Sequence, residues 1–448
     1  MHVGIVGGGI TGLVAGYRLS AAGHQVTLFE ALSELGGQAG TFPIEGTRLE
    51  YYYHHLFRGD KAAVALIEEM GLGPRLAWLT SKVGYFCRGT IYDFVTPLDL
   101  LRFKPLPIFS RLVLGLQTLW LHRLGNWRRL ERVTAREWLL RWGGRAIYDL
   151  IWGALLRSKF GEYADQVSMA WLWGKLVVRR SLKGSELGRE TLGYMMGSFQ
   201  HLTDALAERI VGAGGEIHTS ARVERVGVAD GTAKGLLVTR SSGQGAKPVP
   251  HDFDAVILTV ASPLVLAMVP ELPEAYASVL RSLSYQAAMV MVLKLSHSMS
   301  HIYWLNLPEP DIPVVGAIEH TNYVGPEHYN GAHILYLSNY LSADDPRFRL
   351  PKEELLARYI PYLKRINPAF EAEWVRESWL FKDAYAQPVI GTNYSRRIPA
   401  HRTPIRGLYL ANTSQIYPED RGINYAVRLG QVISEIVQGR EARVSERW

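Results

Sequence analysis

The first thirty residues carry the pattern that most constrains the fold. "HVGIVGGGITGLVAGYRLSAAGHQVTLFE" contains two short apolar runs, His2 to Val6 and Gln25 to Phe29, separated by a glycine-rich turn and an amphipathic stretch. Strand, G-x-G-x-x-G turn, helix and second strand follow one another in the order of a dinucleotide-binding unit. The chain is therefore expected to begin with a Rossmann-like parallel sheet.

Each part of this unit has a physical task. Gly7 permits a tight turn, Gly9 lets the backbone approach a pyrophosphate, and Gly12 lets the helix pack closely on the strand. The helix begins near Ile10 and Thr11, where unpaired N–H groups and a partial positive charge can bind phosphates. These five positions are expected cofactor-binding residues.

An acidic residue follows the second strand. Glu30 lies eighteen residues after Gly12, where a carboxylate can accept hydrogen bonds from ribose hydroxyls. The strand, the helix, the spacing and the acid together predict a nucleotide cofactor. At this point FAD and NAD both remain open.

The residues after Glu30 distinguish the two cofactors. "LSELGGQAGTF" supplies L-G-G-x-x-x-T, with Gly36, Gly37 and Thr41. With the preceding unit it resembles the FAD-binding half of the flavin amine oxidase superfamily, which includes protoporphyrinogen oxidases, carotenoid desaturases and monoamine oxidases. The resemblance implies FAD, with contacts from Gly37 and residue 38. The family usually carries arginine where this chain has Gln38, which puts one cofactor contact in doubt.

The resembled family returns to its cofactor domain twice more, and the first return matches residues 193–226. These residues read as an amphipathic helix followed by one alternating strand. The resemblance places Val223 beside the adenine. Residues 253–260 then read as another buried strand.

The second return matches residues 407–437, which read as strand, loop and helix. The family's strand usually ends in Gly-Asp or similar, whereas this chain has Asn412 there. The helix start would stabilise the negative charge of a reduced flavin. The resemblance therefore implies contacts from Asn412 and from the backbone N–H groups of Asn424, Tyr425 and Ala426.

These segments predict an α/β fold in which a Rossmann-like FAD-binding domain, a parallel sheet with helices, is interleaved with a mixed α+β substrate domain. The part near residues 100–160 is expected to be helical and partly apolar. The predicted FAD-binding segments are 1–59, 193–280 and 386–448, and the predicted substrate-binding segments are 60–192 and 281–385.

The stretch "YYYHHLFRGD", Tyr51 to Asp60, follows the phosphate-binding elements. In the resembled family this segment runs past the isoalloxazine ring, so its tyrosines and His54 or His55 would form the pocket wall. Alternation along a strand would separate the two imidazoles, and the one facing the flavin could change charge near neutral pH. Core packing of the tyrosines is the alternative.

Further side chains are candidate site residues. Tyr385 and Tyr417 are further candidates for the pocket. Lys294 matches either the flavin-proximal lysine of amine oxidases or a solvent-facing strand lysine. No His, Asp or Glu spacing near the paired histidines completes a metal site, so none is predicted.

The resemblance implies an FAD-dependent oxidase, dehydrogenase or desaturase. It would take a hydride from a hydrophobic or amine-type substrate, or an anionic one, and pass electrons to oxygen, a quinone or another acceptor. "HLF" at 55–57 with Asp60 is similar to a His-x-Phe segment of UDP-galactopyranose mutases. The alternative is therefore a flavin-dependent isomerase acting on a nucleotide sugar.

Charge and hydropathy raise the question of a membrane surface. The formal net charge is +7, and seven arginines lie between Arg123 and Arg145 beside the most apolar window, Ile108 to Leu121. The window is too short to span a bilayer, and reads as a core helix, a lid or a monotopic membrane contact. The basic part reads as a solvated helix face or as a site for anionic lipid or substrate.

The same features exclude some partners and suggest a compartment. No nucleic-acid-binding motif accompanies the basic residues, so no such partner is expected. The single cysteine, Cys87, cannot form an internal disulfide. A strand-like run from His2 leaves no room for a signal peptide. The expected location is the cytoplasm, including peripheral contact with the inner face of the membrane.

Overall fold

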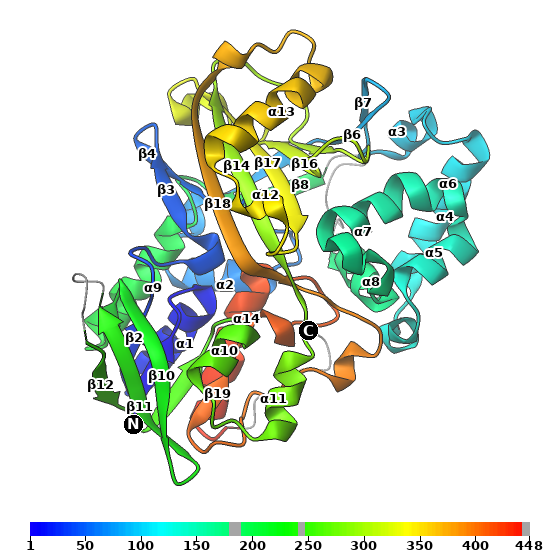
Figure 1. The fold of residues 1–448 in the computed structure, drawn as a ribbon. Helices are drawn as coiled ribbons and strands as arrows, with labels where there is room; N and C mark the ends of the chain where they lie inside the picture. The colour runs from blue at the N-terminus through cyan, green and yellow to red at the C-terminus, as the bar shows by residue number, and fades with distance from the viewer. Residues whose placement is uncertain (179–189, 241–246, 441–448) are drawn as a thin grey trace.

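The computed structural model describes residues 1–178, 190–240 and 247–440 (Figure 1). Parts of the predicted segments 60–192, 193–280 and 386–448 therefore lie outside the described residues. One layer is a five-stranded sheet in which every pairing is parallel. Its strands, in spatial order, are β19 (Leu408–Leu410), β13 (Ala255–Leu258), β1 (His2–Val6), β2 (Gln25–Phe29) and β9 (Glu216–His218).

Helix α1 (Ile10–Ala21) packs between α14 (Ile423–Val437) and α9 (Gln200–Gly212). A Cβ at Gly430 of α14 would lie 2.6 Å from the Cβ of Val14 in α1. Glycine at this position lets the two helices approach closely. The parallel sheet with packed helices confirms the predicted α/β class.

A second, seven-stranded sheet lies next to the first layer (Figure 1). It is antiparallel except where β15 pairs with β6. Helix α13 (Lys352–Ile366) packs against it. Its strands, in spatial order, are β18 (Val375–Pro388), β14 (Tyr285–Leu295), β17 (His333–Leu341), β16 (Gly316–Glu319), β15 (Trp304–Asn306), β6 (Val83–Cys87) and β7 (Thr90–Asp93).

A helical part stands beside the second sheet, on the right of Figure 1. Its main apolar contacts come from buried Trp, Leu and Phe side chains of several helices. A capping box starts one of them, because the Thr134 hydroxyl accepts from the Glu137 N–H. The helices are α3 (Pro97–Arg102), α4 (Ile108–Arg123), α5 (Ala135–Gly143), α7 (Gly153–Phe160) and α8 (Met169–Val178).

Two local predictions are wrong. The end of the 193–226 segment is not one strand, because Ser220 has φ 52° and separates β9 from β10 (Ala221–Ala229), which belongs to another sheet. Residues 51–55 form no strand. The two-domain division remains a proposal.

Candidate active site

The glycine-rich turn has the shape of a phosphate cradle. Gly7 has φ 107°, and a Cβ at Gly12 would lie 2.1 Å from the Gly7 carbonyl oxygen. A Cβ at Gly9 would meet nothing closer than 3.9 Å, so Gly9 borders open space. No side chain caps α1, whose first residues are Ile10 and Thr11. Backbone donors and room for a pyrophosphate therefore occur together.

Glu30 is fixed at the end of β2. Its carboxylate accepts from the N–H groups of Gly8 at 2.7 Å and Leu32 at 2.8 Å, and the residue is buried. The Glu30 carbonyl accepts from Ala221, so β10 begins beside it, and Val223 is buried two residues further on. The carboxylate is thus held beside the glycine-rich turn, and its contact with a ribose stays a prediction.

The start of α14 adjoins the start of α1. The Thr11 hydroxyl donates to the Ala426 carbonyl at 3.2 Å. The Asn424 side chain accepts from Ala62 at 3.0 Å and Ala63 at 3.1 Å, in the first turn of α2 (Lys61–Glu69). Because that amide oxygen caps another helix, the side chain of Asn424 has a structural role. The predicted flavin contact of Asn424 is that of its backbone N–H.

An arginine lies beside Gln38 in the folded chain. Gln38 Nε2 donates to Asp383 at 2.7 Å, and Gln38 Oε1 accepts from Arg421 Nη1 at 3.0 Å. Arg421 also donates to Gln387 and to the Tyr340 hydroxyl, each at 3.0 Å. A guanidinium therefore lies next to position 38, where the resembled family carries arginine, and it belongs to Arg421, which the sequence reasoning missed.

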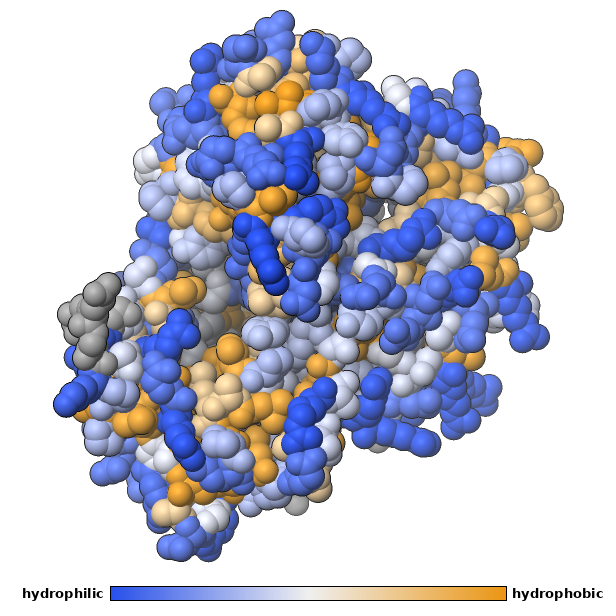
Figure 2. Space-filling view, in the orientation of Figure 1, coloured by the Kyte–Doolittle hydropathy of each residue, from blue (hydrophilic) through white to orange (hydrophobic). Residues whose placement is uncertain are grey.

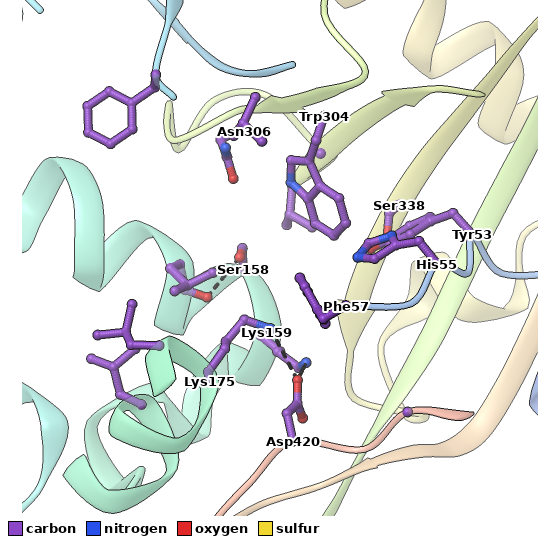
Figure 3. Close-up of a pocket in the computed structure, with 18 of the residues that line it drawn as sticks. Tyr53, His55, Phe57, Ser158, Lys159, Lys175, Trp304, Asn306, Ser338 and Asp420 are labelled. Atoms are coloured by element: carbon purple, nitrogen blue, oxygen red, sulfur yellow. Dashed lines mark hydrogen bonds and ion pairs between the residues drawn. The ribbon is translucent and has the colours of Figure 1, made fainter. Parts of the chain in front are cut away.

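A cavity of about 650 Å³ extends from the start of α14 to the helical part (Figure 3). Tyr53, His55, Trp304 and Ser338 lie on one side of it in Figure 3. Apolar side chains of the helical part, including Trp152, Leu155 and Leu172, line another side. The segment from Arg421 to Tyr425 also borders the cavity.

Both histidines of the paired motif line this cavity. His54 Nδ1 donates to the Tyr52 carbonyl, and His55 Nδ1 lies 3.2 Å from the Tyr303 hydroxyl. The expected separation by strand alternation is wrong, because the segment forms no strand. Burial lowers the pKa of His54 to about 4, so His54 is neutral near pH 7, and which histidine faces the flavin stays a prediction.

Two predicted tyrosines lie outside the cavity wall. The Tyr417 hydroxyl donates to Glu131 at 3.1 Å. The Tyr385 ring packs edge-on against Tyr285, with ring centroids 5.9 Å apart. Nothing in the described contacts brings either tyrosine to His54 or His55, and their roles stay predictions.

Two further candidates are also bound elsewhere. Lys294 forms ion pairs with Glu45 and Glu377 and does not line the cavity. The Asn412 side chain donates to the Val260 carbonyl at 2.9 Å. Both arrangements fit a structural role, and the predicted Asn412 cofactor contact stays a prediction.

One end of the cavity is cationic. Lys159 of α7 and Lys175 of α8 both contact the carboxylate of Asp420, and Arg421 follows directly in the chain (Figure 3). Burial alone would raise the pKa of Asp420, but the three cations hold that pKa well below its usual range. Neither lysine belongs to a recognisable motif, so sequence spacing could not identify this cluster.

The described residues contain neither a metal-binding cluster nor a membrane-spanning helix. No group of three or more His, Cys, Asp or Glu side chains is arranged to hold a metal ion. Within the same ranges, no helix has the length and hydropathy needed to cross a bilayer.

Curated relatives share part of the sequence. The 15-cis-phytoene desaturase of Arabidopsis thaliana is 25% identical over 262 residues, which is 54% of this chain and 46% of that protein. The chain thus spans about half the length of the curated relatives that it matches over long stretches.

Solved structures share the fold over nearly the whole chain. A protein from Exiguobacterium, provisionally named a protoporphyrinogen oxidase, has a TM-score of 0.75 at 20% identity, covering 98% of this chain and 99% of its own. Reduced UDP-galactopyranose mutase has a TM-score of 0.73 at 16% identity, covering 100% and 97%. At such identities the likeness shows the fold alone.

A sequence match over most of the chain shows the family to which this protein belongs. The family described as flavin containing amine oxidoreductase matches residues 10–431, which is most of the chain. This match confirms the prediction of a flavin cofactor, FAD, and the cradle formed by Gly9, Glu30 and the start of α1 fits that group. The chain therefore belongs to the flavin containing amine oxidoreductase family.

Proposed function

We propose that this protein is an FAD-dependent oxidoreductase that takes a hydride from a largely hydrophobic small molecule. The observation that carries the proposal is the position of the cavity. It joins the start of α14, the expected flavin contact, to the apolar wall of the helical part. FAD, when bound, supplies the hydride acceptor, and the protein supplies orientation and electrostatics.

The side chains around the cavity have separate tasks in this proposal. Trp152, Leu155 and Leu172 exclude water and hold an apolar substrate. Neutral His54 donates through Nδ1 to Tyr52, which leaves Nε2 as an acceptor. Arg421 and the positive end of α14 stabilise negative charge that develops beside them. The N–H groups of Tyr425 and Ala426 already donate to the Gly422 carbonyl, so Asn424 supplies the remaining one of the three predicted N–H contacts.

The cationic end suggests the other half of the substrate. Lys159, Lys175 and Arg421 border the cavity with Asp420 as the nearest carboxylate. Three cationic side chains around one end of a buried site favour an anionic group there. We therefore propose an amphiphilic substrate, with an apolar body against the helical part and an acidic group at this end.

Anaerobic reduction of the bound flavin tests the oxidoreductase. We would mix the oxidised FAD-loaded protein with unsaturated lipophilic compounds and with amines such as putrescine, and follow loss of the flavin absorbance band. The expected result is bleaching by an unsaturated lipophilic compound, followed by recovery with oxygen or a quinone. Failure of every compound to bleach the flavin would count against the proposal.

The cationic end also favours a second candidate, because a diphosphate would fit it. A mutase acting on a nucleotide sugar uses reduced flavin and consumes no electron acceptor. The discriminating assay is anaerobic incubation of dithionite-reduced protein with UDP-galactopyranose. Isomerisation without an acceptor would support the mutase; unchanged sugar together with substrate-dependent bleaching supports the oxidoreductase.

A further inference from the structure

The outer surface of α3 and α4 is apolar and exposed. Nine of the fourteen large hydrophobic side chains exposed in the described part of the chain lie between residues 98 and 142. Figure 2 shows an orange surface at its right edge, over the region of these helices in Figure 1. We call six of these residues the apolar face: Leu98, Leu101, Ile108, Phe109, Leu112 and Leu116, which are 44–74% exposed.

Helix α4 is apolar on two sides. Ile108, Leu112 and Leu116 recur at four-residue spacing on the exposed side, whereas Leu114 and Leu121 are buried on the other. A surface helix of a globular protein normally presents a polar outer side. A contiguous apolar patch on the surface marks a binding surface for a protein or a membrane.

Positive charge surrounds the apolar face. Residues 97–145 contain ten Lys or Arg and three Asp or Glu. The excess of seven equals the formal net charge of the whole chain, so the rest of the sequence is balanced. Arg102, Lys104 and Arg123 are exposed at the ends of α3 and α4. Basic residues around an apolar helix face complement anionic lipid headgroups.

The two helices form one connected unit. The Arg111 guanidinium donates to the carbonyls of Leu101 and Leu106, which ties α4 to α3 and to the connection between them. Helices α3 and α4 can therefore contact the same surface as one unit.

We propose that the apolar face docks on the surface of an anionic lipid bilayer, with α4 lying in the interface plane. The sixteen residues of α4 are too few to span the bilayer. A second copy of the chain is the less favourable occupant, because two such faces would bring two strongly basic regions together.

Docking would also bring the cavity close to lipid. Pro97 is exposed, lines the cavity and adjoins Leu98 of the apolar face. Thr118 and His122 line the cavity from the inner side of α4. If the proposed function holds, a lipophilic substrate then passes from the bilayer to the cavity, whereas the docking itself does not depend on that function.

Vesicle co-sedimentation of the FAD-loaded full chain tests the docking. We expect binding to vesicles of phosphatidylcholine with phosphatidylglycerol at low salt, severalfold weaker binding at high salt, and little binding to phosphatidylcholine alone. The double variant Phe109→Ser/Leu116→Ser should bind at least tenfold more weakly. The matched control is Val211→Ser/Leu264→Ser, which changes exposed apolar residues elsewhere and should bind like the wild type.

Three outcomes would overturn the proposal. They are no binding at low salt, equal binding by the wild type and by Phe109→Ser/Leu116→Ser, or a wild-type dimer that this variant abolishes without any vesicle binding. Flavin absorbance reports folding and cofactor retention of each variant. Because the assay involves no turnover, failure of the proposed reaction would leave its result intact.

Discussion

Arg421 places a positive charge beside Gln38, at the position where the resembled family carries arginine. Gln38 lacks the charge that the resembled family carries at that position, and it accepts a hydrogen bond from Arg421 instead. Position 421 directly precedes the segment expected to meet the flavin. A guanidinium there would favour a reduced, negatively charged flavin over the oxidised one.

Arg421→Met should therefore lower the flavin midpoint potential. A loss of about 1.4 kcal/mol corresponds to about 30 mV in a two-electron couple, and a shift of a few tens of millivolts is expected. The measurement is a redox titration of the flavin absorbance. Arg396→Met, at an exposed arginine, is the control and should leave the potential unchanged. An unchanged potential in Arg421→Met would show that the guanidinium does not act on the ring.

His54 makes a prediction about pH. Burial lowers the pKa of His54 from 6.5 to about 4. The folded-state pKa is depressed, so this contribution to stability is present above about pH 6.5 and is lost as the pH falls towards 4. When the pH falls from 7.5 to 5, the unfolding free energy of the wild type should drop because His54 resists protonation in the folded state. The drop in His54→Asn should be smaller by about 1–2 kcal/mol. Urea unfolding at both values measures this.

The control for that experiment is His328→Asn. His328 is exposed, so its replacement should leave the pH dependence of unfolding as it is in the wild type. Equal pH dependence of His54→Asn and the wild type would mean that His54 is solvated and titrates normally.

At the scale of elements, α2 depends on a residue of α14. Asn424 caps the first turn of α2 through two hydrogen bonds from Ala62 and Ala63. Asn424→Ala should lower the unfolding free energy by about 1–2 kcal/mol, because two N–H groups lose their acceptor. Thermal unfolding checks the stability, and Gln431→Ala in the same helix is the control.

The same variant separates two roles of residue 424. Only its backbone N–H is expected to face the flavin, so Asn424→Ala should keep the wild-type flavin spectrum and potential. A large change in either would assign the side chain to the cofactor and contradict the capping role alone.

The sequence predicted the elements best where local pattern and tertiary structure agree. Strands β1 and β2 have the predicted bounds, because an apolar run, a glycine turn and an amphipathic helix all specify the same unit. Alternation failed at residues 51–55 and at Ser220, where packing and a left-handed φ override it. The hydrophobic periodicity of a sequence cannot reveal tertiary packing or a single left-handed residue.

The cavity could be predicted only in part. His54 and His55 lie beside a motif, and the sequence suggested them for that reason. Lys159 of α7 and Lys175 of α8 meet Arg421, which precedes α14 and lies far from both lysines in the chain. Since no spacing records such a meeting, only the folded arrangement reveals the charge of that end.

At the scale of the whole molecule, one ion cluster joins the helical part to the cofactor half. Asp420 precedes α14, while Lys159 and Lys175 belong to α7 and α8. The three side chains are largely buried, with 11–27% of their area exposed. Breaking a buried ion pair from one side costs about 3–5 kcal/mol, because the remaining charge loses its partner.

A double-mutant cycle tests whether this cluster holds the two parts together. Asp420→Asn should destabilise the protein by about 3 kcal/mol, because two lysine ammonium groups lose their nearest carboxylate. Adding Lys159→Met removes one of those stranded charges, so the double variant should unfold at a higher temperature than Asp420→Asn alone. The exposed pair of Arg281 and Glu274 is the control, and its cycle should give less than about 1 kcal/mol of coupling. Additive effects of Asp420→Asn and Lys159→Met would mean that the cluster is solvated, and that the helical part is held by its apolar contacts alone.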